Sequence, residues 1–183
     1  MNWLNSILML LAVFLALFFQ AARGGIGYWF GTQVNLLPVF MVYAGLRGNL
    51  TQIALVALLG GLGFDSLSAN PLGVSVLPLF AAGLLIHVKR DLILRDEFIA
   101  QFVLGLAASA AVPGLTLLLL VSAGQQPLLG WGSLWQWTVM SAAGAFLTPI
   151  CFRLFDLGTR ALSYRPISAT SFRSDREIRR SRS

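Results

Sequence analysis

One carboxylate stands out among the residues of this 183-residue chain that could do chemistry. Asp65 is the first acidic residue, and the sequence around it is apolar. An ionised carboxylate at the centre of a membrane helix costs about 2.5–3.5 kcal/mol. That cost is tolerable if Asp65 lies at a helix end and accepts hydrogen bonds. The following turn offers the Ser66 hydroxyl, the Asn70 amide and the backbone N–H groups before Pro71 as donors.

The sequence leaves three roles open for Asp65. It can simply begin a turn, as Asp often does by binding nearby backbone groups. It can form a polar contact with another subunit. It can also take part in a proton relay, although no second acid stands near it in the sequence.

The other reactive side chains do not form a catalytic or metal-binding pattern. His87 is the only histidine, and its neighbours Lys89 and Arg90 indicate the polar end of a helix. The single Cys151 lies in an apolar run and has no partner for an internal disulfide. A zinc site needs more His or Cys ligands, and no GxSxG or HExxH motif occurs. We therefore predict no enzyme, no cofactor and no bound metal.

The segments that must position these residues are apolar helices. The chain is 57% hydrophobic and 11% charged, and a soluble domain of this size needs more charge to cover its surface. The apolar runs do not alternate as barrel strands do, and a helix satisfies its own backbone groups in lipid. We predict an all-α integral membrane protein, with a six-transmembrane-helix bundle in residues 1–157. The spans are about 3–22, 28–46, 50–64, 72–88, 98–123 and 133–155.

Small residues and prolines shape several of these spans. Ala57 and Gly61 are four residues apart, a spacing that lets helix backbones approach closely, either within the domain or against a partner. A proline within a helix removes one backbone donor and can kink the helix. The prolines within the predicted spans are Pro38, Pro78, Pro113 and Pro149.

The basic residues predict that both termini are cytoplasmic. With six crossings, Arg47, Lys89, Arg90 and Arg95 fall on the cytoplasmic side, and Arg23 is the exception. The first apolar run is longer than the core of a cleaved signal peptide. We therefore expect it to be a retained first helix.

The last segment, residues 158–183, is basic and poor in apolar residues. It carries seven Arg against Asp175 and Glu177, so we predict a disordered cytoplasmic tail. Such a tail favours the anionic lipid of the inner leaflet. Nucleic-acid binding is not predicted, because no aromatic platform accompanies the charge. The predicted membrane-surface anchors are Arg173, Arg176, Arg179 and Arg180.

The middle of the chain carries a more specific pattern. It reads NLLPVFMVYAGLRGN at 35–49 and ALLGGLGFDSLSANPLGVSVLPLFAAGLL at 57–85. A proline-centred second span, a small basic turn and then G-L-x-x-D-x-L followed by P-L-G resembles the MreD family of rod shape-determining proteins. The Arg-rich tail departs from the family's pattern. Asn70, directly before Pro71, is also predicted to be a structural or partner-binding residue. The positions that carry the resemblance are Pro38, Tyr43, Gly61, Leu62, Asp65, Leu67, Pro71, Leu72 and Gly73.

The resemblance implies a non-enzymatic inner-membrane scaffold of the bacterial cell-wall elongation machinery. Its implied partner is MreC, and through MreC the RodA-type peptidoglycan polymerase and the class B penicillin-binding transpeptidase. MreB filaments lie on the cytoplasmic side. The family is similar in fold to the membrane substrate-binding subunits of vitamin (ECF) transporters. By this resemblance, Asp65, Pro71 and Gly73 shape the outer end of the third and fourth spans.

A small-solute transport or substrate-binding membrane subunit is the alternative. Kinked spans allow a cavity, but a binding pocket needs polar groups that converge on the ligand. The obvious polar side chains within the spans are Gln33, Asn35, Gln52 and Asp65.

Overall fold

The computed structural model describes residues 3–21, 35–68, 70–93, 97–125 and 130–162. Within these ranges the chain is helical and contains no strand. The predicted all-helical class is confirmed, and the described residues contain six α-helices, the predicted number. They are α1 (Trp3–Ala21), α3 (Leu37–Arg47), α4 (Leu50–Leu67), α5 (Val76–Lys89), α6 (Phe98–Ser122) and α7 (Trp131–Leu162), with a short 3-10 helix, η1 (Arg90–Leu92), after α5.

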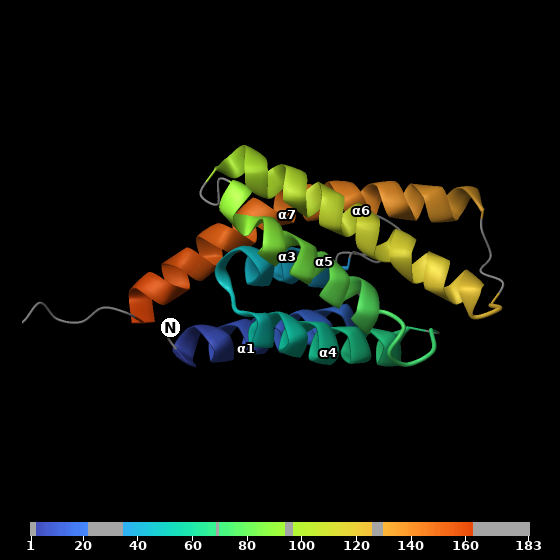
Figure 1. Ribbon diagram of the computed structural model, residues 1–183, viewed down its shortest axis with the longest axis horizontal. Coiled ribbons are helices and arrows are strands. Elements are labelled where there is room, and N and C mark those ends of the chain that lie inside the picture. Colours follow the sequence, from blue (N-terminus) through green and yellow to red (C-terminus); the bar gives the residue numbers. More distant parts are fainter. Residues whose placement is uncertain (1–2, 22–34, 69, 94–96, 126–129, 163–183) are drawn as a thin grey trace, which may run out of the picture.

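The helices stack in three layers (Figure 1). Helices α1 and α4 form one outer layer, α3 and α5 the middle, and α6 and α7 the other outer layer. Helix α3 contacts each of the other five α-helices. Every residue from Leu37 to Leu46 is buried, so α3 is the centre of the core.

The central helix is too short to cross a bilayer. Its 11 residues span about 16 Å at 1.5 Å per residue, against about 30 Å of hydrocarbon. The second predicted span, 28–46, is therefore helical only from Leu37 within the described residues. Its first part, 28–34, lies outside them.

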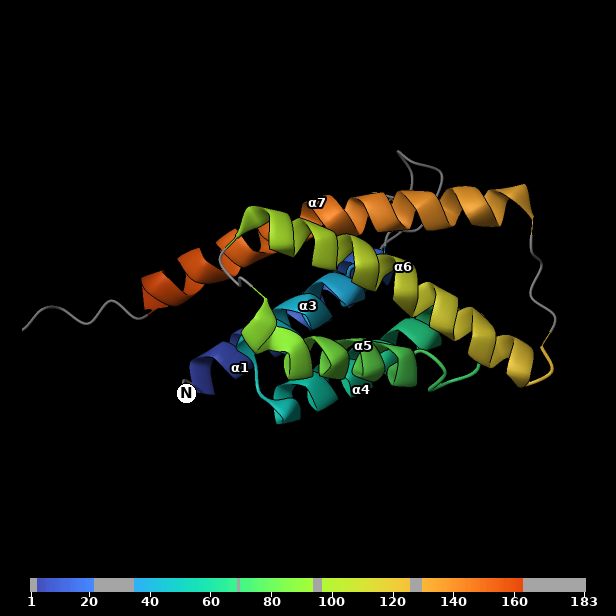
Figure 2. The ribbon, with the colours of Figure 1, turned by 45° about the horizontal axis from the view of Figure 1, so that its top comes forward.

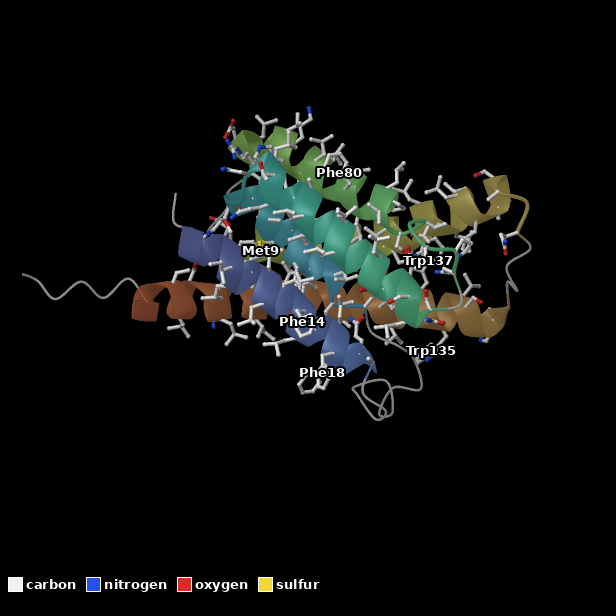
Figure 3. All side chains as sticks on the ribbon, turned by 90° about the horizontal axis from the view of Figure 1, so that it is seen from below. Met9, Phe14, Phe18, Phe80, Trp135 and Trp137 are labelled. Atoms are coloured by element: carbon white, nitrogen blue, oxygen red, sulfur yellow. The ribbon has the colours of Figure 1, made fainter. Side chains whose placement is uncertain are left out.

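In the part of the chain that the structure describes, three helices are long and apolar enough to cross a membrane: Leu50–Leu67, Phe98–Ser122 and Trp131–Thr159. The outer surface of the bundle is also apolar. On α1, Met9 is 2% exposed, whereas Phe14 is 66% exposed and Phe18 is 64% exposed. The two phenylalanine side chains point away from the bundle (Figure 3). Soluble monomers rarely expose large apolar patches. These features indicate a membrane protein.

Several predicted boundaries move. Helix α5 begins at Val76 rather than 72, because the preceding residues form a turn. Helix α7 continues to Leu162, beyond the predicted end at 155 and past the predicted start of the tail at 158. The rest of the predicted tail, 163–183, lies outside the described residues, and so do Arg173, Arg176, Arg179 and Arg180.

The four prolines within the predicted spans occupy two kinds of position. Pro38 and Pro78 lie in the first turns of α3 and α5, where the missing N–H has no partner within the helix to lose. Pro113 and Pro149 do lie inside α6 and α7. Helix α7 changes direction about midway, in the region that contains Pro149 (Figure 1).

The two ends of the bundle differ in composition. Helix α1 begins and α7 ends at the same end (Figure 1). We call it the basic end, because Arg47 lies there at the end of α3, as do Lys89 and Arg90 at the end of α5. The opposite end holds the α4–α5 turn and the start of α7, with Trp131 and Trp135.

Candidate functional site

Asp65 closes the turn between α4 and α5 at the opposite end of the bundle. Its side chain is 1% exposed, in the last turn of α4. The Oδ2 atom accepts hydrogen bonds from the backbone N–H of Gly73 at 2.8 Å and of Ser75 at 3.1 Å. The carboxylate therefore ties the end of α4 to the start of α5.

The energetics of this arrangement favour a buried carboxylate. Hydrogen bonds to a charged group contribute about 1.5–3 kcal/mol each, so two of them offset a burial cost of about 2.5–3.5 kcal/mol. Ser75 is also the N-cap of α5, where the helix dipole favours negative charge. Both N–H groups precede the first hydrogen-bonded turn of α5 and have no partner within that helix. The Asp65 carboxylate supplies their acceptor, and they supply the donors that the carboxylate needs.

One acceptor of this carboxylate is unused. Asp65 Oδ1 is buried and has no hydrogen-bond partner among the described residues. Both backbone N–H groups therefore donate to Oδ2, and only this oxygen contacts the turn through hydrogen bonds.

Two glycines complete this site for different reasons. A Cβ added to Gly61 would lie 2.8 Å from the Cα atom of Val76, so the α4 and α5 backbones are in direct contact there. Gly73 has open space around it, but its φ of +93° is a conformation that side-chain-bearing residues rarely adopt. Gly61 permits the close approach, and Gly73 permits the turn.

The donors expected from the sequence are not the ones used. The exposed Ser66 hydroxyl donates to the Gly63 carbonyl at 2.7 Å instead of to Asp65. Asn70 is half-buried in the turn and Pro71 is exposed. The actual donors follow Pro71 rather than precede it, because the carboxylate faces the start of the next helix.

The two upstream residues of the pattern lie elsewhere. Pro38 is buried in the first turn of α3. Its neighbour Leu37 packs against Gly60 of α4, where an added Cβ would meet the Leu37 side chain. Tyr43 lies toward the basic end and stacks on Phe155, with ring centroids 4.4 Å apart. Of the predicted site residues, Gly61, Asp65 and Gly73 form one unit, and Tyr43 belongs to another.

That second unit was missed by sequence reasoning. At the basic end, Arg47 Nη1 lies 2.5 Å from Asp156 Oδ1, which joins α3 to α7. The Arg47 guanidinium also lies 5.8 Å from the ring centroid of Phe152. The available signal was an isolated acid, Asp156, placed one helical turn after a basic residue, Arg153, near the end of the last span. Nothing in that local pattern points to Arg47.

Other polar side chains at the basic end cap their own helix or contact the end of a neighbouring one. Asn49 and Gln52 form a capping box at the start of α4, and Gln52 also donates to the Ser6 hydroxyl at 2.5 Å. His87 Nδ1 lies 3.3 Å from the Gly45 carbonyl oxygen and 3.5 Å from Arg90 Nη1. These contacts hold helix ends together.

Comparison with known proteins adds no relative. No protein-family model matches the chain, and neither a curated protein nor a solved structure matches it.

Proposed function

We propose that this chain is a non-enzymatic scaffold of the bacterial inner membrane, similar to MreD, that binds an MreC-like protein. The observation that supports this is the unit formed by Gly61, Asp65 and Gly73. Three residues that carry the resemblance build one rigid connection between α4 and α5. All three residues act at the same connection, and an apolar amino-acid composition by itself would not place them together.

The contact surface in this proposal is the outside of that turn. Leu67 is 50% and Leu72 is 72% exposed, and Pro71 between them is exposed as well. Asp65 fixes the backbone that carries these apolar side chains. A surface held in one conformation loses less entropy when it binds.

The remaining parts of the proposal follow the resemblance. In this proposal the chain crosses the inner membrane six times, and the second crossing is made by the whole segment 28–46 rather than by α3 alone. Both termini are in the cytoplasm, so the α4–α5 turn faces the periplasm and MreC. The RodA-type polymerase and the class B transpeptidase associate through MreC, and MreB filaments associate indirectly. Arg173, Arg176, Arg179 and Arg180 bind anionic lipid on the cytoplasmic side.

Solute transport has less support from the described polar residues. Asn35 Oδ1 accepts a hydrogen bond from the N–H of Leu37 at the start of α3. Gln52 binds Ser6 at the basic end, and Asp65 closes the α4–α5 turn. Gln33 lies outside the described residues. The three described side chains therefore do not converge on one pocket, as a solute site requires.

The test is co-purification with an MreC-like protein after co-expression. We expect Asp65→Ala and Gly61→Leu to lower recovery of the partner by about tenfold, the effect of about 1.4 kcal/mol in binding. Ser66→Ala is the control, because this exposed neighbour bonds only to Gly63 in the same helix. Normal recovery with both changes would remove the site assignment.

A second pair of variants separates binding from folding. Leu72→Ser changes an exposed side chain of the turn and leaves the Asp65 hydrogen bonds in place. Its control is Leu92→Ser, at a residue that is 81% exposed at the basic end. Only Leu72→Ser should weaken co-purification. In cells, retention of rod shape after deletion of the gene would contradict the function itself.

A further inference from the structure

Helices α6 and α7 pack closely along one half and diverge along the other (Figure 2). In the close half, a Cβ at Gly105 would collide with Thr148 and a Cβ at Gly144 with Ser109. Toward the opposite end of the bundle the two helices separate in both Figure 1 and Figure 2. A cavity of about 600 Å³ lies between the separated halves, and we call it the α6–α7 groove.

The groove is lined almost wholly by apolar side chains. Helix α6 contributes Pro113, Gly114 and Leu117, and α7 contributes Trp131, Leu134, Trp137 and Met140 among others. Trp135 and Trp137 leave α7 on opposite sides, with Trp137 toward α6 (Figure 3). The Trp137 ring lies against Gly114, where an added Cβ would be 3.2 Å from Cζ2.

The polar groups of this lining are mostly used within the protein. Trp137 Nε1 donates to the Ala110 carbonyl of α6 at 2.9 Å. The Ser133 hydroxyl oxygen accepts a hydrogen bond from the Gly130 N–H at 3.4 Å. Gln136 is the remaining polar side chain of the lining, and it is exposed. A ligand inside the groove would therefore make apolar contacts with its walls and few hydrogen bonds.

We propose that the α6–α7 groove holds one hydrocarbon chain of a membrane lipid. Both walls belong to helices that are long and apolar enough to cross a membrane, so lipid chains would surround the groove. Water is disfavoured because it needs two to four polar partners, and an empty groove forfeits the dispersion contacts of its walls. The volume lies within the range of about 300–1,000 Å³ typical of ligand sites.

This inference rests on the membrane placement proposed above and does not depend on the scaffold role. It is tested with two single-tryptophan variants, made by replacing the other four tryptophans with Phe. One keeps Trp137 in the groove, and the other keeps Trp135, which is 61% exposed on the other side of the same helix. Both are reconstituted into phosphatidylcholine vesicles whose acyl chains are brominated, since bromine quenches tryptophan on contact. Unbrominated vesicles give the reference fluorescence.

We expect the two tryptophans to be quenched to a similar extent. A groove filler, Leu117→Phe in the Trp137 protein, should lower the quenching of Trp137 by about twofold, because the larger side chain occupies the space of the lipid chain. Leu118→Phe is the matched control, at the adjacent residue that is 64% exposed and does not line the groove. It should leave the quenching unchanged.

The contrary outcomes are distinct. Strong quenching of Trp135 with weak quenching of Trp137 would show that something other than lipid fills the groove and would overturn the inference alone. Failure to quench either tryptophan would overturn the membrane placement as well. Native mass spectrometry of the unmodified protein gives an independent measurement. We expect a retained lipid that is lost in Leu117→Phe, and equal retention in both would contradict the groove as its site.

Discussion

The two ends of the bundle close their helix connections with different chemistry. At the opposite end, the buried Asp65 carboxylate binds the backbone N–H groups of residues eight and ten positions further along the chain. At the basic end, Arg47 and Asp156 are 33% and 31% exposed, lie 109 residues apart in the chain and join α3 to α7. A buried side chain bound to backbone fixes one local conformation, whereas a half-exposed pair joins distant helices that packing already places together. We expect the first arrangement to contribute more to stability than the second.

The sharpest way to break this comparison is to remove the buried carboxylate. Asp65→Ala leaves the N–H groups of Gly73 and Ser75 without their acceptor. We expect the free energy of unfolding to fall by about 3 kcal/mol, because an unsatisfied buried donor costs about 1–3 kcal/mol. The hydrogen bond from the Ser75 N–H is buried and that from the Gly73 N–H is partly buried. Unfolding is measured by titration of the protein in mixed micelles with a denaturing detergent.

Asp65→Asn is the matched control for that change. The amide oxygen keeps an acceptor at the same place, so the loss should be clearly smaller than for alanine. Equal losses would mean that the negative charge at the start of α5, rather than the acceptor, stabilises the turn. Unchanged stability in both variants would contradict the account of this site.

The close approach beside Asp65 can be probed with two glycines of α4. Gly61→Ala places a Cβ 2.8 Å from the Val76 Cα atom, so the two backbones must separate. Gly63→Ala meets only the end of the Leu17 side chain, which can move. Both changes gain helix propensity, up to about 1 kcal/mol. We expect Gly61→Ala to be less stable than Gly63→Ala by about 2 kcal/mol in the same unfolding titration.

The reverse order, or equal stability, would show that α4 and α5 separate at no cost. The Asp65 turn would then tolerate a range of helix distances. A co-purification assay on the same two variants would show whether that distance matters for partner binding.

The sequence was informative where the deciding forces are local. Apolar length predicted six helices, and the position of an acid alone in an apolar region left a turn open as one of three roles for Asp65. Which N–H groups it binds was mispredicted, because the donors lie eight and ten residues on and belong to the start of α5. At that start, Val76 packs directly against Gly61 of α4, a contact between two helices that the local sequence does not specify.

Contacts between residues far apart in the chain could not be predicted either, because they depend on how the helices pack. Arg47 lies just past the predicted end of the second span and is the last residue of α3. Its pairing with Asp156 requires α3 to lie against α7. Tyr43 was grouped with Asp65 by the motif, whereas its ring packs on Phe155 from the last helix. Pro38 and Pro78 were placed within spans, where a proline can kink a helix. Both lie in the first turn of a helix, where a proline does not disturb the helix.

The smallest expected effect is at the basic end, where a double-mutant cycle on Arg47 and Asp156 measures the ion pair alone. We expect a coupling energy of about 0.5 kcal/mol from Arg47→Ala, Asp156→Ala and the double variant, because pairs this exposed are screened by solvent. Arg47→Ala should cost more than Asp156→Ala, since it also removes the cation from the ring of Phe152. The coupling should fall further when the salt concentration is raised. A salt-insensitive coupling above about 2 kcal/mol would mean that the pair is desolvated as Asp65 is, and the contrast between the two ends would then be wrong.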